Sequence, residues 1–124
     1  MASILILSKN GDAVPVGLRL MQEGHIVKFY IKEPKAKPSL IRYKNPSQVN
    51  DPKKMLDQFD LVLSDMAGLG NLCDELKEKG KLVLGGGVFN DKLELDREYG
   101  QKVCKSLLKV NTPKSKAFDT EQEI

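Results

Sequence analysis

The sequence predicts an α/β fold, an open parallel sheet of about four strands in the order 2-1-3-4 with helices on both faces. Short apolar runs of strand length alternate along the chain with amphipathic segments of helix length. The apolar runs are nearly continuous, which is typical of parallel strands covered on both faces. With 124 residues, the chain has room for one domain of this Rossmann-like kind.

The first part of the pattern predicts a strand, a helix and a second strand. Residues 4–7 are continuously apolar, and turn residues follow them. A helix is predicted over about residues 13–23, because Pro15 suits its first turn and Gly24 suits its end. Residues 26–31 form the next apolar run, broken by one lysine, and predict the second strand.

Residues 32–54 interrupt this pattern with a long basic excursion. They hold four of the chain's six prolines, and seven basic residues stand against two acidic ones. One interpretation is an anion-binding or substrate-covering loop. The other is a solvated surface loop, which is the usual role of a charge run.

The helix and strand pattern resumes after the excursion. Asp51 and Pro52 suit the N-cap and first position of a short helix that ends near residue 59. Strands are predicted at residues 60–64 and 82–84, with a helix over residues 71–79 between them. The complete order is therefore that of a parallel sheet built from strand–helix–strand units.

Three glycines, residues 85–87, follow the last predicted strand. A polar segment ends at Asp96 and Arg97, and a helix then begins whose apolar face carries Tyr99, Val103 and Leu107. A strand, a glycine turn and a helix in this order are typical of α/β nucleotide and phosphate sites. A tight turn that binds no ligand would need the same glycines, so both interpretations stay open.

Composition excludes several classes of function. The net charge of +3 is too small to indicate a nucleic-acid partner. Cys73 and Cys104 both fall in predicted helices, which favours a reducing, cytoplasmic environment over a disulfide framework. One histidine and two dispersed cysteines predict no metal site. Neither a signal peptide nor a run of about 20 apolar residues is present, so no membrane partner is predicted.

The expected ligand site lies beyond the carboxyl ends of the first and third strands, where the strand order reverses. Glycines in the two loops there could let backbone amides approach a phosphate or carboxylate, which predicts a small anionic substrate. Carboxylates in the same loops could bind an amine or a sugar hydroxyl. The candidate substrate-binding residues are Asn10, Gly11, Asp12, Asp65, Gly68 and Gly70.

Two of these candidates have ordinary structural interpretations as well. Asp12 could be the N-cap of the first helix, and Asp65 could be a turn residue. No catalytic residue is predicted, because no nucleophile lies in a recognisable pattern with a base. The first loop also lacks the GxGxxG fingerprint of dinucleotide domains and the lysine motif of P-loops.

Three segments carry a resemblance to a known family: ILILSKNGDAVPVGLRLMQEGHIVKFYI, FDLVLSDMAGLGNLCDELKEKGKLVLGGG and LELDREYGQKVCKSLLKVNTPKSKAFDT. The chain resembles the N-terminal (pre-ATP-grasp) domain of ATP-grasp ligases, above all phosphoribosylamine–glycine ligase and its phage and archaeal relatives. In that family a segment LE-x-[DS]-[KR]-x-(F/Y) precedes a threonine-proline turn. Here LELDREY at residues 93–99 and Thr112-Pro113 are similar to it.

The resemblance implies ATP-dependent ligation of a carboxylate to an amine, within purine biosynthesis. It implies a nucleotide-binding role for Arg97, and ATP with Mg²⁺ as cofactors of the full-length enzyme. Neither cofactor is expected to bind this chain tightly. Residues 1–110 are predicted as the pre-ATP-grasp domain and residues 111–124 as the start of a truncated ATP-grasp domain, because the helix start signal at Thr120 falls at the end of the sequence.

On this interpretation the chain is a fragment that is inactive without the missing ATP-grasp domain, and the exposed helix of residues 99–108 could let it form a homodimer. The alternative is a stand-alone Rossmann-like module that binds a small anionic ligand and does no chemistry. A receiver-like interaction domain is disfavoured, because the first strand lacks the acidic pair that such a domain needs.

Overall fold

A computed structural model describes residues 1–33, 35 and 48–114 of the chain. It contains a four-stranded parallel sheet in the order β2-β1-β3-β4, which confirms the predicted class and strand order. The elements along the chain are β1 (Ser3–Ser8), α1 (Val14–Gln22), β2 (Ile26–Ile31), the 3-10 helix η2 (Pro52–Gln58), β3 (Leu61–Ser64), α2 (Gly70–Glu78), β4 (Val83–Leu84), α3 (Val88–Leu95) and α4 (Arg97–Ser106).

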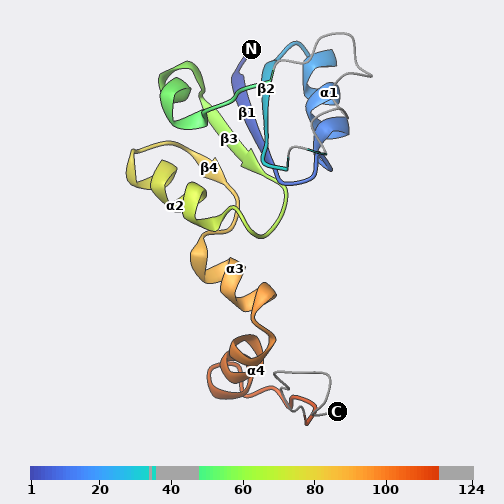
Figure 1. The fold of residues 1–124 in the computed structure, drawn as a ribbon, viewed down its shortest axis with the longest axis vertical. Coiled ribbons are helices and arrows are strands. Elements are labelled where there is room, and N and C mark those ends of the chain that lie inside the picture. Colours follow the sequence, from blue (N-terminus) through green and yellow to red (C-terminus); the bar gives the residue numbers. More distant parts are fainter. Residues whose placement is uncertain (34, 36–47, 115–124) are drawn as a thin grey trace.

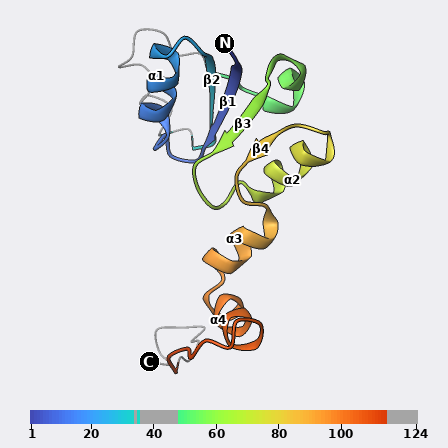
Figure 2. The same ribbon diagram turned by 180° about the vertical axis from the view of Figure 1, so that it is seen from behind.

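The central strand β1 organises the core, because alternate side chains of a strand point to opposite faces of the sheet. Ile4 and Ile6 join an apolar cluster on the face that α1 covers, together with Val14 of that helix. Leu5 and Leu7 join a second cluster on the other face, which η2 and α2 cover. Helices therefore lie on both faces, as predicted (Figures 1 and 2).

Glycine allows α1 to lie very close to the sheet. A Cβ atom built on Gly17 would lie only 2.3 Å from Cζ of Phe29, a buried side chain of β2.

On the opposite face, Asp51 accepts a hydrogen bond from the Lys53 backbone N–H at 3.0 Å, so the predicted N-cap of the short helix is confirmed.

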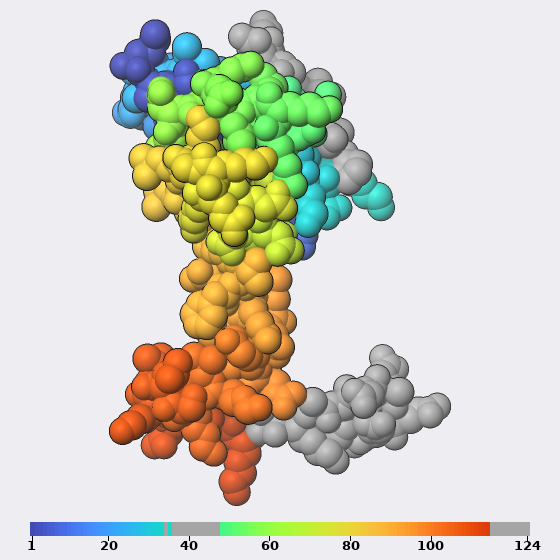
Figure 3. All heavy atoms as spheres, turned by 90° about the vertical axis from the view of Figure 1, so that its left-hand side faces the viewer, coloured from blue at the N-terminus to red at the C-terminus, as the bar shows by residue number. Residues whose placement is uncertain are grey.

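Residues 88–95 were predicted as a polar connecting segment, and this prediction was wrong because they form α3. The local sequence gives little sign of this helix. The backbone N–H of its first residue, Val88, donates to the Asp74 carboxylate of α2 and not to a side chain close in sequence. Figure 3 shows α3 as a narrow connection between the sheet domain and α4. Asp96, which accepts from the Tyr99 N–H at 2.9 Å, separates α3 from α4.

Helix α4 is shorter than its apolar pattern predicted. It ends at Ser106, and Leu107 and Leu108 are 72% and 65% exposed. Tyr99 instead packs edge-on against Phe89 of α3, with ring centroids 6.4 Å apart. Tyr99 thus packs on α3 while Leu107 and Leu108 of the predicted apolar face are exposed, and the homodimer expected from this helix stays a prediction.

Some predictions fall outside the described residues. These are the helix start signal at Thr120, most of the segment 111–124, and the interior of the basic excursion. Among the helices that the structure does describe, none is long and apolar enough to cross a membrane.

Candidate functional site

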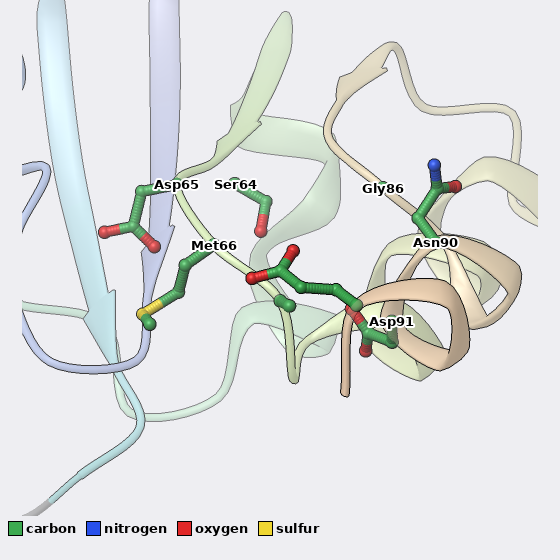
Figure 4. Close-up of a pocket in the computed structure, with 8 residues that line it drawn as sticks. Ser64, Asp65, Met66, Gly86, Asn90 and Asp91 are labelled. Atoms are coloured by element: carbon green, nitrogen blue, oxygen red, sulfur yellow. The ribbon is translucent and has the colours of Figure 1, made fainter. Parts of the chain in front are cut away.

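A hollow of about 270 Å³ lies beyond the carboxyl ends of β3 and β4 (Figure 4). One wall is the loop after β3, and the other is the turn and first part of α3. The hollow lies one strand further along the sheet than the predicted crevice between β1 and β3. Its lining residues are Ser64, Asp65, Met66, Ala67, Gly86, Asn90, Asp91 and Glu94.

Asp65 binds the N-terminus of α1 across the switch point of the sheet. Its Oδ2 accepts from the Ala13 backbone N–H at 3.1 Å and from the Ser8 hydroxyl in a short hydrogen bond. The Ser8 hydroxyl is fully buried and accepts in turn from the Gly11 N–H at 2.8 Å. Figure 4 shows the Asp65 carboxylate turned toward β1, away from Gly86 and Asn90.

This network assigns the capping of α1 to a residue distant in sequence. Asp12 was one interpretation of the N-cap, but Ala13 holds that position without a side-chain cap of its own. Asp65 was predicted either as a ligand-binding residue or as a turn residue. In the structure its carboxylate meets the positive end of the α1 dipole, and its role in ligand binding stays a prediction.

Two further carboxylates cap α2 and α3 reciprocally. The Gly70 N–H, at the start of α2, donates to Oδ2 of Asp91 on α3 at 2.7 Å. The Val88 N–H, at the start of α3, donates to Oδ2 of Asp74 on α2 at 2.8 Å. Each helix thus supplies the charge that the other's N-terminus attracts, which fixes α3 against the end of the sheet.

All three helix N-termini at this edge therefore carry a carboxylate from within the protein. A helix N-terminus is an anion site because its first amides point outward with a partial positive charge. Here the Gly11 amide donates to Ser8 and the Gly70 amide donates to Asp91, so neither of these predicted ligand contacts is directed at the solvent.

The other predicted residues are more dispersed. Asn10 and Asp12 are exposed on the loop after β1. Gly68 adopts a φ of 99°, and its carbonyl accepts from Nζ of Lys32 at 3.2 Å. Arg97 begins α4, which lies beyond α3 from the sheet (Figures 1 and 2). The structure thus brings Gly11 and Asp65 together through Ser8, but it places Arg97 away from this edge.

The chemistry of the hollow is dominated by hydrogen-bond acceptors. Glu94 and Asp91 contribute carboxylates, although Oδ2 of Asp91 already accepts from the Gly70 N–H, while the Ser64 hydroxyl and the Asn90 amide can donate as well as accept. Carboxylates accept hydrogen bonds and attract positive charge, so a ligand that carries amine or hydroxyl groups complements this wall. Within the described part of the chain, no cluster of three or more histidine, cysteine or acidic residues could hold a metal ion.

Sequence reasoning missed Ser8, Asp74, Asp91 and Glu94. Ser8 could have been identified as the polar residue that ends a buried strand at the switch point. Asp74 and Asp91 bear no local signal, because each lies within its own helix and caps an amide 14 or 21 residues away. Glu94 was hidden because its helix was not predicted.

Cys73 is buried and is hydrogen-bonded with Ser64, a lining residue of the hollow, and we predict that it reacts far more slowly than Cys104. Burial raises the pKa of the Cys73 thiol, while a hydrogen bond with Ser64 opposes that shift. Because the thiolate is the reactive form, we expect Cys104 to react with a chromogenic aromatic disulfide first, and Cys73 on the order of 100-fold more slowly. Stopped-flow absorbance measures both phases.

The Cys104→Ser variant is the control, since it should retain only the slow phase until urea unfolds the chain. Two fast phases in the folded wild type would contradict the burial of Cys73. The raised pKa also gives a sign for stability. The folded state holds the thiol proton more tightly than the unfolded chain, so this contribution is complete below the ordinary thiol pKa and declines as pH rises above it.

Comparisons with known proteins support the assignment of the fold but identify no family. No model of a protein family and no curated protein matches this sequence. An imine reductase from Pseudomonas sp. has a similar structure, with a TM-score of 0.51 and 15% identity over 81% of this chain and 38% of that one. A 3-hydroxyisobutyrate dehydrogenase from Mycobacterium tuberculosis, described with L-serine, gives 0.49 and 16% over 64% of this chain and 26% of that one.

At such low identity, the imine reductase shows a shared Rossmann-like fold and nothing about activity. The chain spans well under half the length of either protein. The imine reductase is not named as a ligase, and no family model matches this chain.

The resemblance to ATP-grasp ligases is overturned, because the similar structure is named as an imine reductase and neither a family model nor a curated protein supports a ligase. The ligase activity, the place in purine biosynthesis, and ATP with Mg²⁺ as cofactors are therefore withdrawn, whereas the nucleotide-binding role of Arg97 stays a prediction. The structure gives a physical reason why the motif misled. Asp96 caps α4 and Tyr99 packs on Phe89, so these two residues of the motif at 93–99 have structural roles that need no nucleotide.

Proposed function

We propose that this chain is a Rossmann-like ligand-binding module, not catalytic by itself, that binds a small polar molecule in the hollow beyond β3 and β4. One observation carries the proposal. The hollow lies at the carboxyl edge of an open parallel sheet, which is the edge where this class of fold binds its ligands, one strand away from the switch point between β1 and β3.

The size and lining of the hollow support a small ligand with amine or hydroxyl groups. Its volume of about 270 Å³ is just below the ~300–1,000 Å³ typical of sites for drug-sized ligands. Glu94 and Ser64 present oxygen acceptors on opposite walls. A positively charged amine would form charge-assisted hydrogen bonds to such a wall, and these are stronger than neutral ones.

A small anionic ligand, as predicted from the sequence, is the second candidate. It is supported by two lysines beside the loop after β3. Lys32 donates to the Gly68 carbonyl, and the side chain of Lys9 runs within 4 Å of the position that a Cβ on Gly68 would occupy. An anion here would contact lysine side chains rather than helix N-termini.

Three sugars that share one ring distinguish the two candidates by calorimetry. Glucosamine carries an amine, glucose is neutral, and glucose 6-phosphate is anionic. We expect glucosamine to bind in roughly the millimolar range and more tightly than the other two, because Glu94 and Asp91 favour its charge. Glu94→Gln is expected to weaken glucosamine binding about tenfold, since it removes one charge-assisted contact.

Glu98→Gln is the matched control, because Glu98 is an exposed glutamate at the start of α4 that does not line the hollow. Its affinity for glucosamine should stay within twofold of the wild type. Tighter binding of glucose 6-phosphate, unaffected by Glu94→Gln, would favour the anionic candidate. The absence of binding for all three sugars would contradict the proposed module.

A further inference from the structure

The class of fold implies a dinucleotide whose pyrophosphate lies on the N-terminus of the first helix. The residues present do not fit that group. A dinucleotide loop uses three glycines, the second of which lets the pyrophosphate approach the backbone closely. Here the loop between β1 and α1 contains one glycine, Gly11, with a φ of 88°.

The position of the phosphate is also filled by the protein itself. The Ala13 N–H is the amide that an anion at this helix end would accept from, and it donates to Oδ2 of Asp65 at 3.1 Å. The same oxygen accepts from the Ser8 hydroxyl, which is fully buried and holds the Gly11 amide at 2.8 Å. The amides of Gly11 and Ala13, the Ser8 hydroxyl and the Asp65 carboxylate thus form one hydrogen-bond network, and the carboxylate occupies the position that an anion would take.

We propose that Asp65 is a specificity-determining residue that excludes phosphate groups from the N-terminus of α1. A ligand phosphate could reach the Ala13 amide only by displacing Asp65 or by lying beside its carboxylate. Two like charges within a few ångströms repel strongly at a partly screened surface. The inference deepens the proposed function, since it explains why the adjacent hollow selects amine or hydroxyl groups over phosphates.

Inorganic pyrophosphate and reduced nicotinamide adenine dinucleotide are the probes, and amide NMR shifts of Gly11 and Ala13 are the readout. In the wild type, neither probe should shift these two amides in a saturable way. In Asp65→Ala, pyrophosphate should bind at least tenfold more tightly, with its largest shift at Ala13. Asp65→Asn keeps the shape and an acceptor oxygen but removes the charge, and a smaller gain is expected.

Asp60→Asn is a matched control at the other end of the same strand segment. Asp60 accepts from the Ser3 N–H at 2.7 Å, as Asp65 accepts from Ala13, so the variant has the same change in charge away from the ligand edge. It should bind pyrophosphate as weakly as the wild type. If Asp65→Ala does not fold, Asp65→Asn carries the comparison.

Saturable shifts at Ala13 in the wild type would overturn the inference, whatever the variants do. It would also be overturned if a folded Asp65 variant bound pyrophosphate no more tightly than the wild type. Neither result bears on glucosamine binding in the hollow. Failure of the proposed function would show instead as the absence of sugar binding, so the two failures are distinguishable.

Discussion

The Gly70→Ala variant is expected to lose about 3 kcal/mol of its free energy of unfolding. A Cβ at Gly70 would lie 2.5 Å from the carbonyl carbon of Gly87 and 2.6 Å from Oδ2 of Asp91. The first is a backbone atom and cannot rotate aside. The clash can be relieved only if α3 moves away from α2, which breaks the hydrogen bond between the Gly70 N–H and Asp91. Losing this charge-assisted hydrogen bond costs about 1.5–3 kcal/mol, and overpacking costs about 1–3 kcal/mol.

Urea unfolding followed by circular dichroism measures this loss. Asn71→Ala is the control at the next residue, which is exposed in the same helix, and it should change the free energy of unfolding by less than about 0.5 kcal/mol. Equal stabilities of Gly70→Ala and Asn71→Ala would show that α2 and α3 do not meet as described. The variant should also lose sugar binding, because Asn90 and Glu94 move with α3.

The Gly17→Ala variant is expected to lose about 2 kcal/mol, against the usual helical preference for alanine of about 1 kcal/mol. Its Cβ would lie 2.3 Å from Cζ of Phe29 and 2.8 Å from Cδ1 of Ile6. Phe29 is only 2% exposed, so its ring has no route into solvent. The helix must therefore lift from the sheet or the core must repack, and thermal unfolding measures the cost.

A smaller partner should relieve the clash. Phe29→Leu alone leaves a cavity, but in combination with Gly17→Ala the freed space receives the new methyl group. We expect the double variant to be more stable than the sum of the two single changes by about 1 kcal/mol. Val16→Ala, at a neighbouring exposed position, is the control for helix propensity. Strict additivity would contradict the close approach of α1 to β2.

The sheet could be predicted because its cause is local. Strand β1 is buried on both faces, so every residue from Ile4 to Leu7 is apolar. This apolar run alone is enough to predict a strand. Asp51 as N-cap and Pro52 directly after it likewise predict the start of η2. Parallel pairing then follows from the crossover connections between consecutive strands, and the predicted order β2-β1-β3-β4 agrees with the structure.

The candidate site could be predicted only in part, because its contacts join residues distant in sequence. Asp65 was selected as a polar residue after β3, but its acceptor role toward Ala13 and Ser8 spans 52 and 57 residues. Helix α3 has the same difficulty, since Asp74 of another helix supplies its cap. A pattern of single residues cannot show which helix end receives a carboxylate from elsewhere.

For function, this means that the carboxyl edge of the sheet already has aspartate carboxylates at its helix N-termini. The sequence pattern of glycines after strands suggested amides free to bind an anion, whereas the folded loops direct Gly11 and Gly70 to Ser8 and Asp91. What remains open at the edge is the hollow with Glu94 and Ser64 in its walls. Its chemistry favours a donor-rich ligand.

The central claim is that a small donor-bearing molecule binds between the loop after β3 and helix α3. Mapping the amide shifts of the wild-type protein during a glucosamine titration tests it most directly. We predict that the largest shifts occur at Ser64, Met66 and Asn90, which line the hollow from both sides. Shifts confined to the far end of the sheet, near Asp60 and Gly80, would contradict the claim.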